Sequence, residues 1–301
     1  MMKQLFALIC SVFFFSNGAV VKASGTDTLA HALLWKVTGK NLQKPSYLFG
    51  TYHLMTNEFS KTVKGLNKAF KKSNIVVGEI VMNSELSSQL MPYMVLKNGT
   101  LDSLLGKERF DSLDKALKSR AGLSAMILNK LKPTAVYTIF VTTELKKSGL
   151  LESGNGSPMD VYFQDHAREK KKEVKGLETV EEQAAILFGT TSLERQCDLL
   201  MDYVRKGGAE SHEQNKKMKE CYTAQNLNCL SGMMSSSEFS DAETTDLLDK
   251  RNNAWVPQLE KWMPDNSLFV AVGALHLTGE TGLITQLRKR GYTVEPVSTT
   301  R

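Results

Sequence analysis

The chain has 301 residues, of which 42% are hydrophobic, 23% charged and 8% aromatic. This composition is typical of a globular protein, and it excludes a collagen-like chain, a disulfide-dense miniprotein and a disordered acidic tail. The formal net charge is +6. The basic clusters at residues 68–72 and 170–172 lack the aromatic pattern of a base-stacking surface, so we expect solvated helix faces and no nucleic-acid partner.

The first residues have the features of an export signal. Lys3 precedes an apolar run over residues 5–15, and Val21-Lys22-Ala23 offers small residues where a signal peptidase cleaves. The run is too short for a comfortable membrane span, and Cys10 lacks the small preceding residue of a lipoprotein. We therefore predict a signal peptide over residues 1–23 and a periplasmic or secreted mature chain. No later stretch approaches about eighteen consecutive apolar residues, so we expect the mature chain to be soluble.

Three cysteines remain after signal removal: Cys197, Cys221 and Cys229. An oxidising compartment permits one disulfide among them and leaves one cysteine unpaired. Cys221 and Cys229 are near enough in sequence to close a small loop, but Cys197 can equally pair with either. The chain has no CxxC motif, so we expect structural cysteines and no thiolate zinc site.

The first half of the mature chain predicts a strand–helix–strand unit. Residues 33–37 and 46–49 have the pattern of strands, and Gly50 stops the second. Residues 75–77 form another buried apolar run, which ends at Gly78-Glu79. Between them, apolar spacings of four, three and four predict one helical face, made of Phe59, Val63, Leu66 and Phe70. Such a unit favours a parallel sheet with a crossover helix.

The middle of the chain is mainly helical. Leucine spacings over residues 84–149 predict an all-α excursion that covers one end of the sheet. After a glycine-rich loop, Asp160 can cap a helix that runs to about residue 167, and residues 173–177 return as a strand. Thr179 and Glu182 form a capping box at the start of the next helix.

The last third completes the sheet. After a helical region over residues 197–251, residues 268–272 and 292–294 are predicted strands, separated by a helix over 282–290. The expected fold class is therefore α/β, with a central mixed, mainly parallel sheet and helical insertions. We expect one domain over residues 24–301, with the helical excursion at about 84–150.

Two of the five histidines share one sequence pattern. His53 and His276 each lie in a Gly-x-x-His-Leu segment that directly follows a hydrophobic strand. In a parallel sheet, residues beyond the carboxyl ends of strands converge on one crevice, and glycine lets the backbone turn there. Glu79 follows the strand at residues 75–77 and can reach the same place. Two histidines and one carboxylate form a recognised ligand set for a divalent metal.

Each of these residues also has an ordinary interpretation. A histidine after a strand is often a core or capping residue. A glutamate at a strand end is often the solvated partner of a lysine. The shared pattern of His53 and His276, together with Glu79 on a third strand, favours the metal site over these separate interpretations.

Four segments resemble the TraB/GumN family, which includes the animal Tiki proteases. They are Leu34-Trp35-Lys36-Val37 with Tyr47 to His53, Gly176-Leu177-Glu178-Thr179 with Glu182-Gln183, Arg251-Asn252-Asn253-Ala254-Trp255, and Val272 to Gly279 with Gly282-Leu283 and Leu287 to Tyr292. The resemblance covers about residues 33–297. It implies a fold similar to the erythromycin-esterase and ChaN-like proteins and, from Tiki, a metal-dependent peptidase activity.

The resemblance also implies a functional set and an ion. The family pattern maps onto His53, Glu79 and His276, and manganese or cobalt is the implied ion. From ligand type alone, zinc, manganese, iron and cobalt all remain open. In the corresponding mechanism, the ion polarises a scissile amide carbonyl and lowers the pKa of a bound water. Glu79 is then either a third ligand or the general base.

Three further residues are candidates for supporting roles. Arg251 can stabilise a developing oxyanion, and Asp160 or Glu178 can orient a ligand histidine. Each has an ordinary alternative: a helix cap for Asp160, a helix-start charge for Glu178 and a surface cation for Arg251.

Several common catalytic motifs do not occur in the chain. It has no Gly-x-Ser-x-Gly elbow, His-Glu-x-x-His helix, P-loop or Gly-x-Gly-x-x-Gly, so serine hydrolase, classical zincin and nucleotide-binding functions lack support. The leading hypothesis is an exported metal-dependent peptidase with a peptide or protein substrate. The alternatives are a non-catalytic periplasmic metal- or haem-binding protein, as among ChaN-like relatives, and an envelope interaction protein whose helical excursion is the partner surface. The sequence does not set the oligomeric state.

Overall fold

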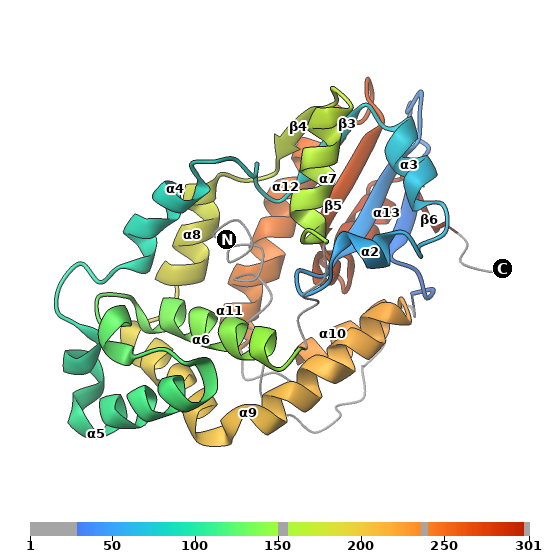
Figure 1. The fold of residues 1–301 in the computed structure, drawn as a ribbon. Helices are drawn as coiled ribbons and strands as arrows, with labels where there is room; N and C mark the ends of the chain where they lie inside the picture. The colour runs from blue at the N-terminus through green and yellow to red at the C-terminus, as the bar shows by residue number, and fades with distance from the viewer. Residues whose placement is uncertain (1–28, 150–155, 236–239, 298–301) are drawn as a thin grey trace.

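The computed structural model describes residues 29–149, 156–235 and 240–297, apart from the side chains of residues 208–211 and 235 (Figure 1). The predicted signal peptide over residues 1–23 lies outside these ranges. Within them, no helix is both long and apolar enough to cross a membrane.

A six-stranded sheet forms the centre of the fold, in the order β4-β3-β5-β2-β1-β6. Its strands are β1 (Leu34–Thr38), β2 (Ser46–Thr51), β3 (Ile75–Gly78), β4 (Glu173–Gly176), β5 (Leu268–Gly273) and β6 (Thr293–Pro296). The neighbours β4, β3, β5 and β2 are parallel, whereas β1 is antiparallel to β2 and to β6. The predicted α/β fold with a mixed, mainly parallel sheet is confirmed.

The central strand β5 comes from the last part of the chain and pairs with two strands from its first part. It lies between β2 and β3, so the crossover from β2 to β3 passes over the position that β5 later fills. All six residues of β2 are buried, as are five of six in β5, which is typical of strands covered on both faces. In their register Thr51 pairs with Gly273, so both strands end at the same level of the sheet.

Helices cover both faces of the sheet (Figure 1). On one face lie α3 (Leu66–Lys72) and α7 (Met159–Glu169), and an aromatic cluster with ring centroids 5.0–6.2 Å apart joins them to the strands. The cluster consists of Phe49, Phe70, Phe163 and Phe269. On the other face lie α12 (Lys250–Trp262) and α13 (Leu283–Lys289), whose Arg288 guanidinium lies over the Trp35 ring.

The single helix predicted across residues 59–70 is wrong. The structure has two short helices there, α2 (Asn57–Ser60) and α3, because Gly65 adopts a left-handed backbone conformation with φ of 83°. A Cβ at this glycine would also approach Val297 Cγ1 to 2.9 Å. The apolar spacing still marks the inward side of the segment, because Val63, Leu66 and Phe70 are buried and Phe59 is partly buried.

Two helical segments extend beyond the carboxyl edge of the sheet. Between β3 and β4 lie α4 (Leu86–Met94), α5 (Leu101–Ala116), η1 (Leu117–Ala121), η2 (Ala125–Leu128) and α6 (Pro133–Lys147). Between β4 and β5 lie α8 (Val180–Gly189), α9 (Leu193–Thr223), α10 (Leu227–Ser235), α11 (Asp241–Thr244) and η3 (Thr245–Asp249). The segments pack together through α4 with α8, and through α5 and α6 with α9 (Figure 1). The predicted helical insertions are confirmed.

A disulfide between Cys221 and Cys229 connects α9 to α10, with the two Cα atoms 5.7 Å apart. Cys197 is a free, buried thiol. The structure thus selects one of the pairings that the sequence leaves open. The adjacent Tyr222 hydroxyl donates to the Gly50 carbonyl at 2.8 Å, so the disulfide lies next to a contact between α9 and the end of β2.

Candidate active site

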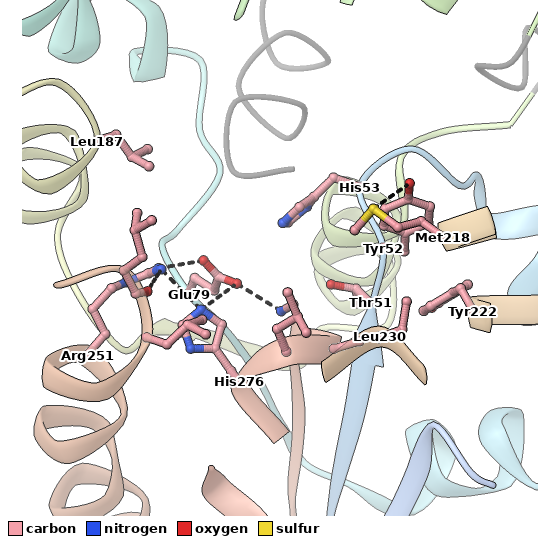
Figure 2. A pocket seen from close by; sticks show the side chains of 15 residues that line it. Thr51, Tyr52, His53, Glu79, Leu187, Met218, Tyr222, Leu230, Arg251 and His276 are labelled. Atoms are coloured by element: carbon pink, nitrogen blue, oxygen red, sulfur yellow. Dashed lines mark hydrogen bonds and ion pairs between the residues drawn. The ribbon is translucent and has the colours of Figure 1, made fainter. Parts of the chain in front are cut away.

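The polar residues at the carboxyl edge of the sheet meet in one pocket (Figure 2). His53 lies two residues beyond β2, and Glu79 directly follows β3. His276 lies in η4 (Ala274–Leu277), a short 3₁₀ helix that continues from β5. Arg251 reaches the same pocket from the first turn of α12. The parallel strands therefore bring together residues that are up to 223 positions apart.

Gly273, the last residue of β5, lies where these side chains converge. Its backbone N–H donates to Glu79 Oε1 at 2.9 Å. A Cβ at this position would lie 3.3 Å from Glu79 Oε1, 3.6 Å from His276 Cδ2 and 3.8 Å from His53 Nε2. The lack of a side chain here therefore leaves room between the two imidazoles and the carboxylate.

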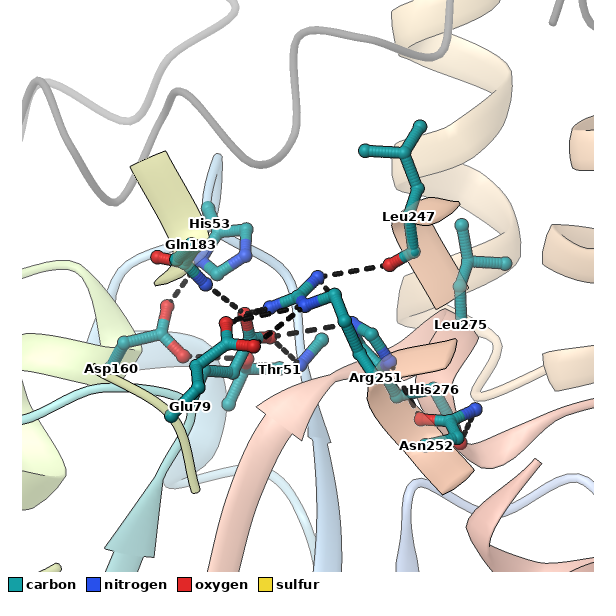
Figure 3. A network of polar contacts seen from close by, with 12 residues as sticks. Thr51, His53, Glu79, Asp160, Gln183, Leu247, Arg251, Asn252, Leu275 and His276 are labelled. Atoms are coloured by element: carbon teal, nitrogen blue, oxygen red, sulfur yellow. Dashed lines mark hydrogen bonds and ion pairs between the residues drawn. The ribbon is translucent and has the colours of Figure 1, made fainter. Parts of the chain in front are cut away.

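Glu79 is a buried carboxylate held by several donors (Figure 3). Arg251 Nη2 donates to its Oε2 at 2.6 Å, and Gln183 Nε2 donates to the same oxygen at 2.8 Å. Burial alone would raise the pKa of Glu79, but Arg251 and the two nearby histidines outweigh it and hold that pKa well below its usual range. Glu79 is therefore ionised at neutral pH.

Arg251 is shared between two carboxylates. Its Nη2 also donates to Glu178 Oε1 at 2.6 Å, and its Nη1 donates to the Leu247 carbonyl at 3.0 Å. Burial raises the pKa of Glu178, although Arg251 opposes this effect. Only 6% of Arg251 is exposed, so the alternative interpretation as a surface cation is wrong.

The tautomer of His276 is determined by its neighbours. Asn252 donates from Nδ2 to the His276 carbonyl at 3.3 Å, which turns Asn252 Oδ1 toward His276 Nδ1 at 2.8 Å. The ring proton therefore lies on Nδ1, and the lone pair on Nε2 accepts from Arg251 Nη1 at 3.1 Å. Burial and the positive charge of Arg251 lower the pKa of His276 to about 3, so the ring is neutral.

His53 is oriented by a carboxylate. Its Nδ1 lies 2.5 Å from Asp160 Oδ2, and the other oxygen of Asp160 accepts from the Thr51 hydroxyl at 2.7 Å. Burial favours the neutral ring, but Asp160 outweighs it and raises the pKa of His53 above its ordinary value. This contact keeps the proton on Nδ1, and the ring points toward Glu79 (Figure 2).

The predicted helix cap at Asp160 is wrong. Pro158 occupies the N-cap position of α7, and Asp160 lies in the first turn of the helix with its carboxylate against Thr51 and His53. The capping box of Thr179 and Glu182 is confirmed by reciprocal hydrogen bonds of 3.1 and 2.8 Å.

Three polar contacts in the site were not singled out from the sequence. They are made by Thr51, Gln183 and Asn252. Each lies in a segment that resembles the TraB/GumN family: Thr51 in the first Gly-x-x-His segment, Gln183 next to Glu182 and Asn252 next to Arg251. Their positions within these segments were the available signal.

The imidazole and carboxylate groups of the site are of the types that bind divalent cations. Each histidine has its Nδ1 held by an oxygen acceptor, Asp160 or Asn252, which is the usual arrangement when Nε2 is a metal ligand. Among the residues described, however, no group of three or more His, Cys, Asp or Glu side chains is arranged to hold a metal ion. Arg251 donates to His276 Nε2 and to Glu79 Oε2, so its guanidinium engages atoms that an ion would use.

These features define an α/β protein with a buried centre of two histidines, a glutamate and an arginine at the carboxyl edge of its sheet. Residues 33–296 match the model of the TraB/PrgY/gumN family, and the chain belongs to this family.

Three relatives illustrate the range of the similarity. Metalloprotease TIKI2 of Danio rerio is 23% identical over 88% of this chain and 61% of its own length. Metalloprotease TIKI1 of Xenopus tropicalis is 22% identical over 92% of this chain and 64% of its own length. Uncharacterized protein YbaP of Escherichia coli (strain K12) is 25% identical over 80% of this chain and 87% of its own length. The chain thus spans about three fifths of the Tiki proteins that it matches.

Proposed function

We propose that the protein is an exported, metal-dependent hydrolase, namely a peptidase with a peptide or protein substrate. The observation that carries the proposal is the matched orientation of two buried histidines. Asp160 and Asn252 each hold one Nδ1 proton, so that His53 and His276 offer their Nε2 atoms beside an ionised Glu79. The Tiki relatives, which are named metalloproteases, support a peptidase over a metal carrier.

In this proposal His53, His276 and Glu79 hold the ion, with Glu79 as a third ligand or as the general base. When bound, a divalent ion polarises a carbonyl oxygen and lowers the pKa of a coordinated water. The family resemblance favours manganese or cobalt, and the donor types also suit zinc or iron. We further propose residues 24–301 as one domain, with a periplasmic or secreted location.

The other residues of the site orient these groups. Asp160 keeps the His53 proton on Nδ1, and Asn252 does the same for His276. Glu178 positions the guanidinium of Arg251, which carries the positive charge for a developing oxyanion. Glu79 accepts from Gly273 N–H through one oxygen and from Arg251 through the other, so its carboxylate plane is fixed.

A digest of a defined peptide library tests the proposal. We expect purified mature protein loaded with manganese, cobalt or zinc to cleave peptides, and a chelator to abolish cleavage. Glu79→Gln should lower kcat/KM by at least about a hundredfold, a typical loss for a general base or ligand. The matched control Glu58→Gln changes an exposed glutamate paired with Lys61 and should leave the rate unchanged. Cleavage that survives both the chelator and Glu79→Gln would refute the proposal, and metal binding without cleavage would favour the non-catalytic binding protein.

A further inference from the structure

The pocket has a polar centre and mostly apolar walls. Around the polar centre, the lining side chains are mostly aliphatic or aromatic, and the hollow encloses about 640 Å³ including its open mouth. Six leucine and methionine residues line it: Leu187, Met218, Leu230, Leu247, Leu248 and Leu275.

The apolar lining is found on both sides of the polar centre (Figure 2). Leu187 lies above Arg251 at the upper left of this view, and the Leu247 carbonyl accepts from the same arginine at 3.0 Å. On the side of His53, Met218 accepts from the Tyr52 hydroxyl at 3.9 Å, and Leu230 lies nearby. A carbonyl group bound at the polar centre would therefore have an apolar surface on each side.

Within the part of the chain that the structure describes, the pocket lining has no charged group beyond those of the centre itself. Among the described residues that line it, the charged or ionisable side chains other than tyrosines are His53, Glu79, Arg251 and His276. Both tyrosine hydroxyls are engaged: Tyr222 donates to the Gly50 carbonyl, and the other, on Tyr52, donates to Met218 Sδ. A charged substrate side chain would lose its hydration among leucines without gaining a partner, which disfavours its binding.

Five of these six leucine and methionine residues come from the helical segment between β4 and β5, and Leu275 comes from η4. Leu187 belongs to α8, Met218 to α9, Leu230 to α10 and Leu247 to η3. The strands thus supply the polar centre, and this helical segment supplies the surface beside it.

We infer that the substrate is an extended peptide with uncharged, apolar side chains on both sides of the scissile bond, selected by the leucine- and methionine-lined walls of α8, α9, α10 and η3. This inference rests on the proposed hydrolytic function, but the recognition itself requires no turnover. Burial of one leucine-sized side chain is sufficient for a preference on the order of tenfold to a hundredfold over a polar side chain of equal size.

Binding of labelled hexapeptides to the wild-type protein in the presence of a chelator tests the inference without catalysis. The peptides differ only in their two central residues: Leu-Leu, Asn-Asn, Asp-Asp or Lys-Lys. We expect fluorescence anisotropy to give at least about tenfold tighter binding of Leu-Leu than of the other three. Equal binding of the four peptides, or no binding of Leu-Leu at millimolar protein, would overturn the inference.

Two variants assign the preference to the two walls. Leu247→Asn and Met218→Gln preserve side-chain size and should each reduce the Leu-Leu preference on the order of tenfold. Ile127→Asn is the control, because this isoleucine is 70% exposed on η2 and outside the pocket lining. If both variants fold and both keep the wild-type preference for the Leu-Leu peptide, the assignment of this preference to the two walls is refuted. If a variant does not fold, the binding of the four peptides to the wild-type protein still tests the inference.

The same peptides separate this inference from the proposed function. With metal-loaded protein, a Leu-Leu preference in binding without cleavage of any peptide would refute the hydrolase and keep the apolar recognition. Cleavage of Asp-Asp or Lys-Lys peptides at the rate of Leu-Leu would keep the hydrolase and refute the apolar recognition.

Discussion

Arg251 donates to the atoms through which the proposed ligands would bind a metal ion. Its guanidinium donates to His276 Nε2 at 3.1 Å and to Glu79 Oε2 at 2.6 Å, so an ion that uses either atom must displace the corresponding hydrogen bond. Arg251→Gln removes this competition. A hydrogen bond from a charged donor contributes about 1.5–3 kcal/mol, so we expect about ten- to a hundredfold tighter metal binding.

The same substitution should have opposite effects on stability and turnover. Without the guanidinium, the buried carboxylates of Glu79 and Glu178 lose their cation, which predicts a loss of about 3–5 kcal/mol in the free energy of unfolding without metal. Added metal should restore part of it by binding to Glu79. Peptide turnover should fall because the positive charge for the oxyanion is lost.

Competition against a fluorescent chelator at pH 7 measures the metal affinity directly. The control Arg290→Gln removes a more exposed arginine that pairs with Glu260, and it should bind metal as the wild type does. Equal or weaker metal binding by folded Arg251→Gln would refute the competition and would indicate that Arg251 instead holds Glu79 in its binding orientation.

Three further predictions follow from single contacts. Gly273→Ala places a methyl group 3.3 Å from Glu79 Oε1 and should weaken metal binding at least about tenfold, measured by the same competition, because overpacking shifts the ligands. Asp160→Asn should lower the pKa of His53 in metal-free protein, observed by NMR titration. Because Asp160 raises the folded-state pKa of His53, the stabilisation by this pair is complete below the unfolded-state pKa of about 6.5 and is lost as the pH rises through the raised value. Replacement of Cys221 and Cys229 by serine should lower the free energy of unfolding by about 2–3 kcal/mol in denaturant titrations.

Each of these predictions has a control or a contradicting result. Gly189→Ala adds a methyl group with no atom within 4 Å and should leave metal binding unchanged. A pKa of His53 that is the same or higher in Asp160→Asn would contradict the dominance of that carboxylate. Cys197→Ser removes the free thiol and retains the disulfide, so a stability loss as large as that of the double serine variant would argue against the disulfide as the cause.

The sequence was sufficient to predict that the site residues meet at one edge of the sheet, because this meeting depends more on the strand topology than on side-chain contacts. Glycine after an apolar run marks a strand end, and parallel strand ends meet at one edge of a sheet. The pattern at Gly50 and Gly273 therefore predicted the common edge, and the register of Thr51 with Gly273 brings the two segments to one level. The position of β5 between β2 and β3 was not predictable, because strand order is set by long-range packing.

Side-chain partners were less accessible from the sequence. An aspartate near a helix start has the local pattern of a cap, and only the placement of the start of α7 beside the end of β2 brings the Asp160 carboxylate to Thr51 and His53. Arg251 lies in a polar stretch that resembles a solvated helix face, whereas the structure buries it between two glutamates. The break at Gly65 needs a left-handed backbone conformation that an apolar spacing alone does not reveal.

The metal content of purified mature protein tests the central claim most directly. After reconstitution with manganese, cobalt or zinc and removal of loose ions, elemental analysis should find about one ion per chain in the wild type, as three protein ligands with open positions predict. His53→Ala and His276→Ala should each lose it, and His31→Ala, which changes an exposed histidine, should retain it. Wild-type protein that retains none of these ions, or histidine variants that retain the full amount, would contradict the proposed site.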